Sequence, residues 1–171
     1  MINLQGKILC GGVASAAAYV FHRNAEHKTD NTSLSASEEE KRLSLSVSEV
    51  REELRQCAEK AESESAREIF EIHRMMLEDE DVTDCLRNAV RTDGTGAENA
   101  VLQTEQYFSQ MFLATQDPYM MARIDDIRDV CGRLLARLSK REAFTMPQDP
   151  FILVAGELLP GELLQFEGKK L

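Results

Sequence analysis

The densest group of side chains that could do chemistry is a run of acids over 78–81, directly after an apolar stretch that begins at Ile69. Such carboxylates can bind a cation or attract a basic protein. Successive residues of a helix point in different directions, so neighbouring carboxylates there do not converge on one ion. The pattern therefore favours a solvated acidic surface over a metal site.

The other reactive side chains form no catalytic or metal-binding pattern. The histidines, at His22, His27 and His73, are scattered, and no Ser/His/Asp arrangement has a recognisable context. The four cysteines are widely spaced and lack the Cys-x-x-Cys spacing of zinc sites. We interpret them as reduced thiols of a cytoplasmic protein, and we expect no metal or cofactor in this chain.

Composition narrows the class of partner. The chain has 171 residues, and its 30 acids against 20 bases give a net charge of -10. Binding to nucleic acid needs clustered Lys and Arg, so this balance argues against it and favours a basic protein. Solubility alone would also explain the acid excess. The apolar segment over 8–21 is interrupted by glycines and is too short to cross a membrane, so no membrane partner is expected.

The segment over 67–81 reads as a helix with more apolar surface than one core can cover. An amphipathic helix needs a single apolar stripe. Here the apolar side chains point in almost every direction: Ile69, Phe70, Ile72, Met75, Met76 and Leu77. The spacing puts Ile69, His73, Met76 and Glu80 on one face, and Phe70 and Leu77 on the face toward the core. We therefore expect a second apolar face that meets another part of the chain or a partner.

The elements that must position this segment can be predicted from periodicity and capping signals. Short strands are expected over 7–10 and 19–22, and a strand over 151–155 is followed by a short helix that reaches Phe166. Between them we expect helices over 65–80 and 82–91, and three more that begin at the capping signals Ser35 with Glu38, Thr95 with Glu98, and Asp117 with Pro118. The fold is thus mostly α, with helices over 34–141 inserted between flanking segments 1–25 and 148–171 that pair as a partial α/β unit.

Three segments together resemble the N-terminal region of Enzyme I, the phosphoenolpyruvate–protein phosphotransferase of the bacterial sugar phosphotransferase system. They are IFEIHRMMLEDED over 69–81, IDDIRDVCGRLL over 124–135 and FILVAGELLPGE over 151–162. Their order and spacing agree with the family over nearly the whole chain. The resemblance implies a four-helix bundle-like, HPr-binding subdomain inserted into a partial α/β phosphohistidine subdomain.

The resemblance also sets expectations about activity. The family's phosphorylated histidine lies in a segment that would follow Leu171, and none of the three histidines matches its context. We therefore expect no catalytic residue here and an inactive fragment in isolation. Mg²⁺ and phosphoenolpyruvate bind a separate C-terminal domain in the family, and full-length relatives dimerise through that domain. This piece is expected to be a cytoplasmic monomer.

The resemblance implies that the small basic carrier protein HPr docks on the helices. The expected contact residues are Ile69, His73, Met75, Met76, Asp79, Glu80, Asp81, Met120 and Arg123. Other roles stay open for three of them: a histidine without function, methionines in the core, and an arginine paired within its own helix. Two other functions also stay open. One is a regulatory or scaffolding bundle without transfer activity, and the other is the related domain of the dihydroxyacetone kinase multiphosphoryl transfer protein.

Overall fold

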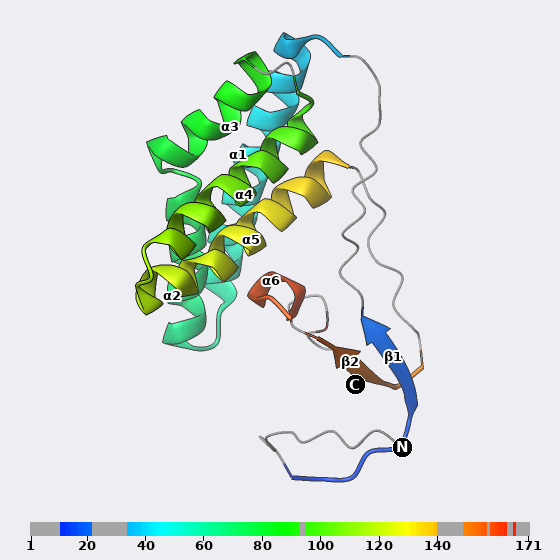
Figure 1. Ribbon diagram of the computed structural model, residues 1–171. Coiled ribbons are helices and arrows are strands. Elements are labelled where there is room, and N and C mark those ends of the chain that lie inside the picture. Colours follow the sequence, from blue (N-terminus) through cyan, green and yellow to red (C-terminus); the bar gives the residue numbers. More distant parts are fainter. Residues whose placement is uncertain are drawn as a thin grey trace, which may run out of the picture.

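The computed structural model describes residues 11–21, 34–92, 95–139, 149–156, 158–163 and 166. Helices dominate these residues, and a single pair of strands accompanies them (Figure 1). The elements in chain order are β1 (Ala17–Phe21), α1 (Ala36–Lys60), α2 (Glu64–Met76), α3 (Glu80–Thr92), α4 (Ala97–Ala114), α5 (Pro118–Leu138), β2 (Phe151–Ala155) and α6 (Pro160–Leu163). The expected mostly α fold with a small α/β part is confirmed.

The helical part packs as a bundle around one mostly aliphatic core. Helix α2 contacts α1 and α5, whereas α3 contacts α1 and α4. The two short helices therefore together occupy one of the four helix positions of the bundle. Helices α4 and α5 run side by side across the face drawn at the front of Figure 1. All residues of the buried apolar cluster come from these five helices and the residues that join them, between Leu43 and Leu138.

Two of the three predicted helix starts have the expected caps. Ser35 and Glu38 form a complete capping box, and Asp117 accepts a hydrogen bond from the amide of Tyr119. The box expected at Thr95 is wrong, because Gly96 precedes α4 and makes no side-chain cap. The Thr95 hydroxyl donates instead to the carbonyl of Ala89, at 2.9 Å.

The helix expected over 65–80 is also wrong at its end. Helix α2 stops at Met76, and Leu77, fully buried at 0% exposure, follows it as the C-cap. A new helix begins at Glu80, and Asp79 starts it by accepting a hydrogen bond from the amide of Asp81 at 2.8 Å. Glu80 therefore does not continue the face of Ile69 and Met76, contrary to the expectation from spacing.

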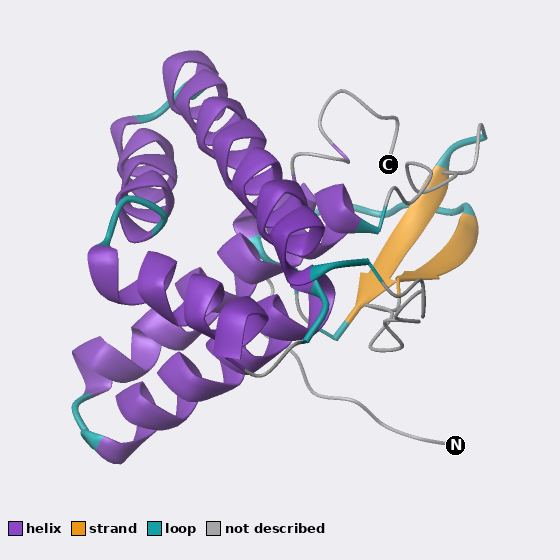
Figure 2. Cartoon of the chain, turned by 90° about the horizontal axis from the view of Figure 1, so that it is seen from above, coloured by secondary structure: helices purple, strands orange, loops and turns teal. Residues whose placement is uncertain are grey.

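The strands β1 and β2 form a parallel pair on one side of the bundle (Figure 2). Ala17 pairs with Phe151 and Phe21 with Ala155, which brings segments from near the two ends of the chain together. Strand β2 matches its predicted bounds, and β1 overlaps the strand expected over 19–22; the strand expected over 7–10 lies outside the described residues. The division into two subdomains at residues 34 and 141 stays a prediction.

Candidate partner-docking surface

The predicted contact residues lie on α2, on the residues that join it to α3, in the first turn of α3 and near the start of α5, and α2 contacts α5. Met75 is the most exposed apolar side chain of the segment over 67–81, at 60% exposure. The three acids over 79–81 are also exposed. Ile69, Met76, Met120 and Arg123 are half-buried, and both Met76 and Met120 also pack against the core. The apolar excess of this segment is thus largely used inside the bundle, and Met75 is its main exposed remainder.

His73 lies inside the bundle rather than on its surface. Its side chain is 0% exposed, because α2 and α5 close over it. The expectation that His73 faces outward with Ile69 and Met76 is therefore wrong. The reason is that α5 contributes two acids, Asp126 and Asp129, which give the ring polar partners in the interior.

The two ring nitrogens of His73 face two different carboxylates. Nε2 lies 3.1 Å from Asp126 Oδ1 in a hydrogen bond, and Nδ1 lies 3.1 Å from Asp129 Oδ2 at an angle outside hydrogen-bond geometry. Burial opposes a charge on the ring, but the two carboxylates outweigh burial and raise the pKa of His73. The neutral ring therefore keeps its proton on Nε2, and the second proton would point toward Asp129.

Asp126 is shared between the buried histidine and a surface arginine. Its Oδ2 accepts a hydrogen bond from Arg123 at 2.9 Å, and its Oδ1 accepts one from His73 Nε2. Arg123 also donates to the Tyr119 hydroxyl, and its guanidinium lies 4.7 Å from the centre of that ring. Burial opposes ionisation of Asp126, but the bonds from His73 and Arg123 outweigh it and lower the pKa of the carboxyl.

A second set of ion pairs links Asp129 of α5 to α1. The Asp129 carboxylate accepts from Arg133 Nε at 3.2 Å, and Arg133 also pairs with Glu53 of α1. Glu53 accepts in turn from Arg137 at 2.6 Å. The guanidinium of Arg133 lies 5.9 Å from the ring centre of Phe70. These groups tie α1, α2 and α5 together.

The family model described as PEP-utilising enzyme, N-terminal, matches residues 5–123. This chain belongs to that family. Similar proteins include the phosphoenolpyruvate-protein phosphotransferases of Latilactobacillus sakei, 29% identical over 99% of this chain, and Lactococcus lactis subsp. lactis, 30% identical over 97% of it. The chain spans about 30% of the length of each of these relatives.

Solved structures agree with membership of the PEP-utilising family. The N-terminal domain of Enzyme 1 - Nitrogen superposes with a TM-score of 0.68 over 94% of this chain and 68% of that one, at 26% identity. An NMR structure of Enzyme I has the same fold, with a TM-score of 0.59 over 77% of this chain and 53% of that one, at 23% identity. The resemblance to the N-terminal domain of Enzyme I is thereby confirmed.

The described part of this PEP-utilising family member holds no group of three His, Cys, Asp or Glu side chains arranged to bind a metal ion. Cys57, Cys85 and Cys131 are free thiols. None of the helices in the described ranges is long and apolar enough to span a membrane. The polar groups that sequence reasoning missed are Glu53, Asp126, Asp129 and Arg133. The one available signal was the pair of acids three residues apart on the apolar side of α5, since a carboxylate buried there needs a cationic or hydrogen-bonding partner.

Proposed function

We propose that this chain is the carrier-docking part of a phosphoenolpyruvate–protein phosphotransferase, and that an HPr-like basic carrier docks at the junction of α2 and α3 beside the start of α5. The observation that carries this proposal is Met75, 60% exposed among exposed acids. Neither Met75 nor these acids belongs to the apolar core of the bundle. Met75 offers an adaptable apolar contact, and the acids beside it offer attraction to a basic partner.

The arrangement suits a contact that forms and releases repeatedly. Methionine side chains repack at small energetic cost, so Met75 and the outer parts of Met76 and Met120 supply an adaptable apolar centre. The acids over 78–81 extend beyond it and attract basic residues of the carrier over a distance. Such steering raises the association rate and weakens as salt is added.

The acids also have a structural explanation, which the experiment must separate from docking. Asp79 caps α3, and Glu80 and Asp81 lie in its first turn, where negative charge is favourable. Of the three, only Asp79 makes a capping bond, so Glu80 can be reversed with little loss of helix stability.

The remaining steps of the reaction belong to the proposal for the full-length protein. Phosphoenolpyruvate and Mg²⁺ would act in the part of the relatives that this chain does not span, and the phosphorylated histidine would lie in a segment that follows Leu171. Within this proposal the chain docks its carrier in the cytoplasm, as a monomer in isolation, and uses no cofactor of its own.

The test is calorimetric titration with purified HPr from the same organism. Met75→Ala together with Glu80→Lys should weaken binding by more than tenfold, because the change removes the apolar centre and reverses a steering charge. Added salt should weaken binding of the original chain more than that of the variant. The far-UV circular dichroism spectrum should stay unchanged, since both side chains are exposed.

A matched control comes from the outer face of α1. Leu45→Ala with Glu49→Lys removes an exposed apolar side chain, 61% exposed, and reverses an acid four residues later. This control should bind HPr as the original chain does. If the original chain fails to bind, the scaffold alternative replaces the proposal; if both double variants lose affinity equally, only net charge matters and the assigned surface is wrong.

A further inference from the structure

We propose that His73 is a positioning residue for carrier docking: through one oxygen of Asp126 it keeps Arg123 oriented toward the bound carrier. This inference rests on the proposed function, because it assigns a role within the same surface. It replaces the direct contact expected of His73 with an indirect one. A carrier cannot touch His73, whose side chain is fully buried.

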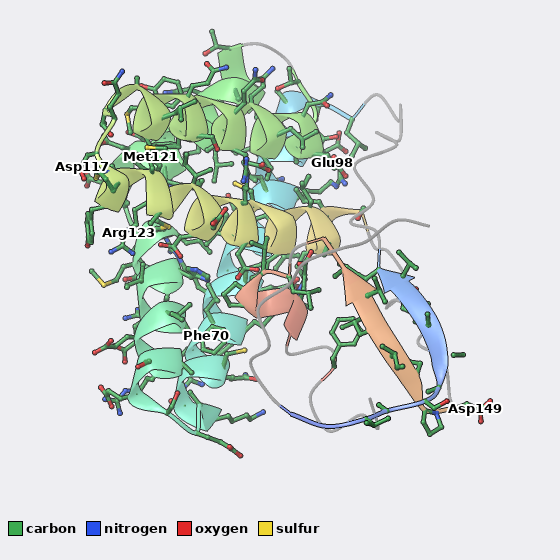
Figure 3. All side chains as sticks on the ribbon, turned by 60° about the horizontal axis from the view of Figure 1, so that its bottom comes forward. Phe70, Glu98, Asp117, Met121, Arg123 and Asp149 are labelled. Atoms are coloured by element: carbon green, nitrogen blue, oxygen red, sulfur yellow. The ribbon has the colours of Figure 1, made fainter. Side chains whose placement is uncertain are left out.

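The first step is the division of the Asp126 carboxylate. One oxygen accepts from His73 on α2 and the other from Arg123, one turn earlier on α5. Asp126 is only partly covered, so it spans the distance between the interior and the surface. Figure 3 shows Arg123 on the early turns of α5, with α2 below it. The carboxylate plane is thus fixed from the inside by a residue of another helix.

The second step is what this division prevents. A free carboxylate and a guanidinium form a bidentate pair that uses both oxygens and two N–H groups. With Oδ1 engaged by His73, Arg123 gives Asp126 only its first terminal nitrogen, and its second reaches the Tyr119 hydroxyl. The guanidinium therefore lies over the ring of Tyr119 instead of pairing with both oxygens of Asp126. There it can donate to a backbone carbonyl or carboxylate of the carrier.

The third step is the set of charged groups around His73. Asp126 and Asp129 face the ring from α5. Arg123 and Arg133 stand behind these two acids, and Glu53 of α1 pairs with Arg133. Asp129 keeps a cationic partner when His73 changes, whereas Asp126 would be left to Arg123 alone. Loss of His73 should therefore change the position of Arg123 more than that of Arg133.

The experiment compares two amide variants that each keep one half of the histidine. His73→Gln places an amide nitrogen near the position of Nε2 and retains the bond to Asp126. His73→Asn places its amide near the position of Nδ1 and reaches only Asp129. We expect HPr affinity close to that of the original chain for His73→Gln and about tenfold weaker for His73→Asn, the loss typical of a charge-assisted hydrogen bond.

A double-variant cycle tests whether the effect passes through Arg123. Arg123→Ala should weaken HPr binding by itself, and His73→Asn should then cause no further loss in the Arg123→Ala background. Arg128→Ala serves as the control, since Arg128 is an exposed arginine of α5 that pairs with Asp125. It should leave affinity unchanged. Urea unfolding of every variant separates loss of fold from loss of docking.

Three outcomes would overturn the inference while leaving the proposed function intact. They are equal affinities for the two amide variants, additive losses of His73→Asn and Arg123→Ala, or losses that track unfolding free energy alone. If the original chain itself fails to bind HPr, the proposed function fails first, and the inference fails with it.

Discussion

A buried histidine between two carboxylates makes the stability of this bundle depend on pH. The ring of His73 and the acids Asp126 and Asp129 favour each other's charged forms, so the pKa of His73 is raised and, against the effect of burial, those of both acids are lowered. Each shift is also a statement about folding, because the unfolded chain has ordinary values.

The sign differs for the two kinds of group. For His73, the stabilisation is fully present below its unfolded pKa of about 6.5 and is lost as pH rises through the higher folded value. For the two acids, it is present above about pH 3.9 and is lost as pH falls through their lowered values. We therefore expect urea unfolding to show the highest free energy between about pH 4 and pH 6.5. His73→Gln should flatten the decline above that range, and an unchanged decline in the variant would place its origin elsewhere.

Glu39 is a second residue whose role depends on a distant partner. It is 6% exposed, and its Oε2 accepts from the amide of Ala97 at 3.0 Å and from Arg42 at 2.7 Å. A side chain of α1 thus supplies the cap that α4 lacks locally, and Arg42 reaches the carbonyl of Leu138 at the end of α5.

Glu39→Ala should lower the free energy of unfolding by about 1–3 kcal/mol, the usual cost of leaving a buried donor unpaired. The measurement is chemical denaturation followed by circular dichroism. Glu49→Ala, on the exposed side of the same helix, is the control and should change stability by less than about 0.5 kcal/mol. Equal effects of the two substitutions would show that Glu39 does not cap α4.

Neither residue could be found from sequence periodicity. Glu39 lies 58 positions from Ala97, and His73 lies 53 positions from Asp126. Local signals predict caps within three or four residues, so they pointed to Thr95 for α4. The same reasoning assigned His73 to the surface because its own helix offers no information about acids on α5.

At the scale of elements, the tight link between α4 and α5 sets the angle at which α5 begins. Gln116 has a φ of 54°, in the left-handed region that glycine or asparagine usually occupies at such a position. Asp117 then caps α5, and Pro118 stands in its first turn. The Asp117–Pro118 signal was predicted, whereas the conformation of Gln116 was not, because glutamine carries no preference for it.

Two substitutions at Gln116 should change the stability of the chain in opposite directions. Gln116→Gly relieves a left-handed conformation that costs about 1 kcal/mol for other residues and should stabilise the chain by up to that amount, less the added freedom of the unfolded chain. Gln116→Val should destabilise it, because a β-branched side chain fits this region poorly. Thermal unfolding of both variants measures the difference, and equal melting temperatures would contradict the assigned backbone conformation.

The break between α2 and α3 was predicted about four residues too late, after residue 80 instead of after Met76, for a related reason. The apolar spacing continues through Leu77 and predicts one helix as far as residue 80. The buried Leu77 instead ends α2, and the carboxylate of Asp79 begins α3. An acid that follows an apolar residue is compatible with a helix interior and with an N-cap, so local spacing does not decide between them.

On the scale of the whole molecule, the buried apolar cluster of the bundle is made by the helices and includes no residue of the strand pair. The buried apolar cluster runs from Leu43 to Leu138, whereas Phe151, Leu159 and Phe166 are buried outside it. Figures 1 and 2 both place the strands to one side of the bundle. The overall mostly α architecture followed from local periodicity, because each long helix has its own apolar stripe, and α1 and α5 also have their own capping signals.

Residues 34–139 expressed alone should therefore fold as a cooperative helical unit. Their far-UV circular dichroism should show a helical spectrum, and their melting temperature should be close to that of the whole chain, since no residue of the bundle core is removed. A sloping, non-cooperative melt would show that the strand pair contributes to the core and that the division at residues 34 and 141 is wrong.

The exposed position of Met75 and the neighbouring acids has a consequence for how such proteins diverge. Under the proposed function, recognition would fall to side chains outside the bundle core, whereas Leu77 and His73 are fully buried. Mutations at these exposed positions would then change the choice of partner with little loss of folding free energy. Duplicated copies of this chain could acquire separate carriers through a few charge reversals, each tolerated from the first step.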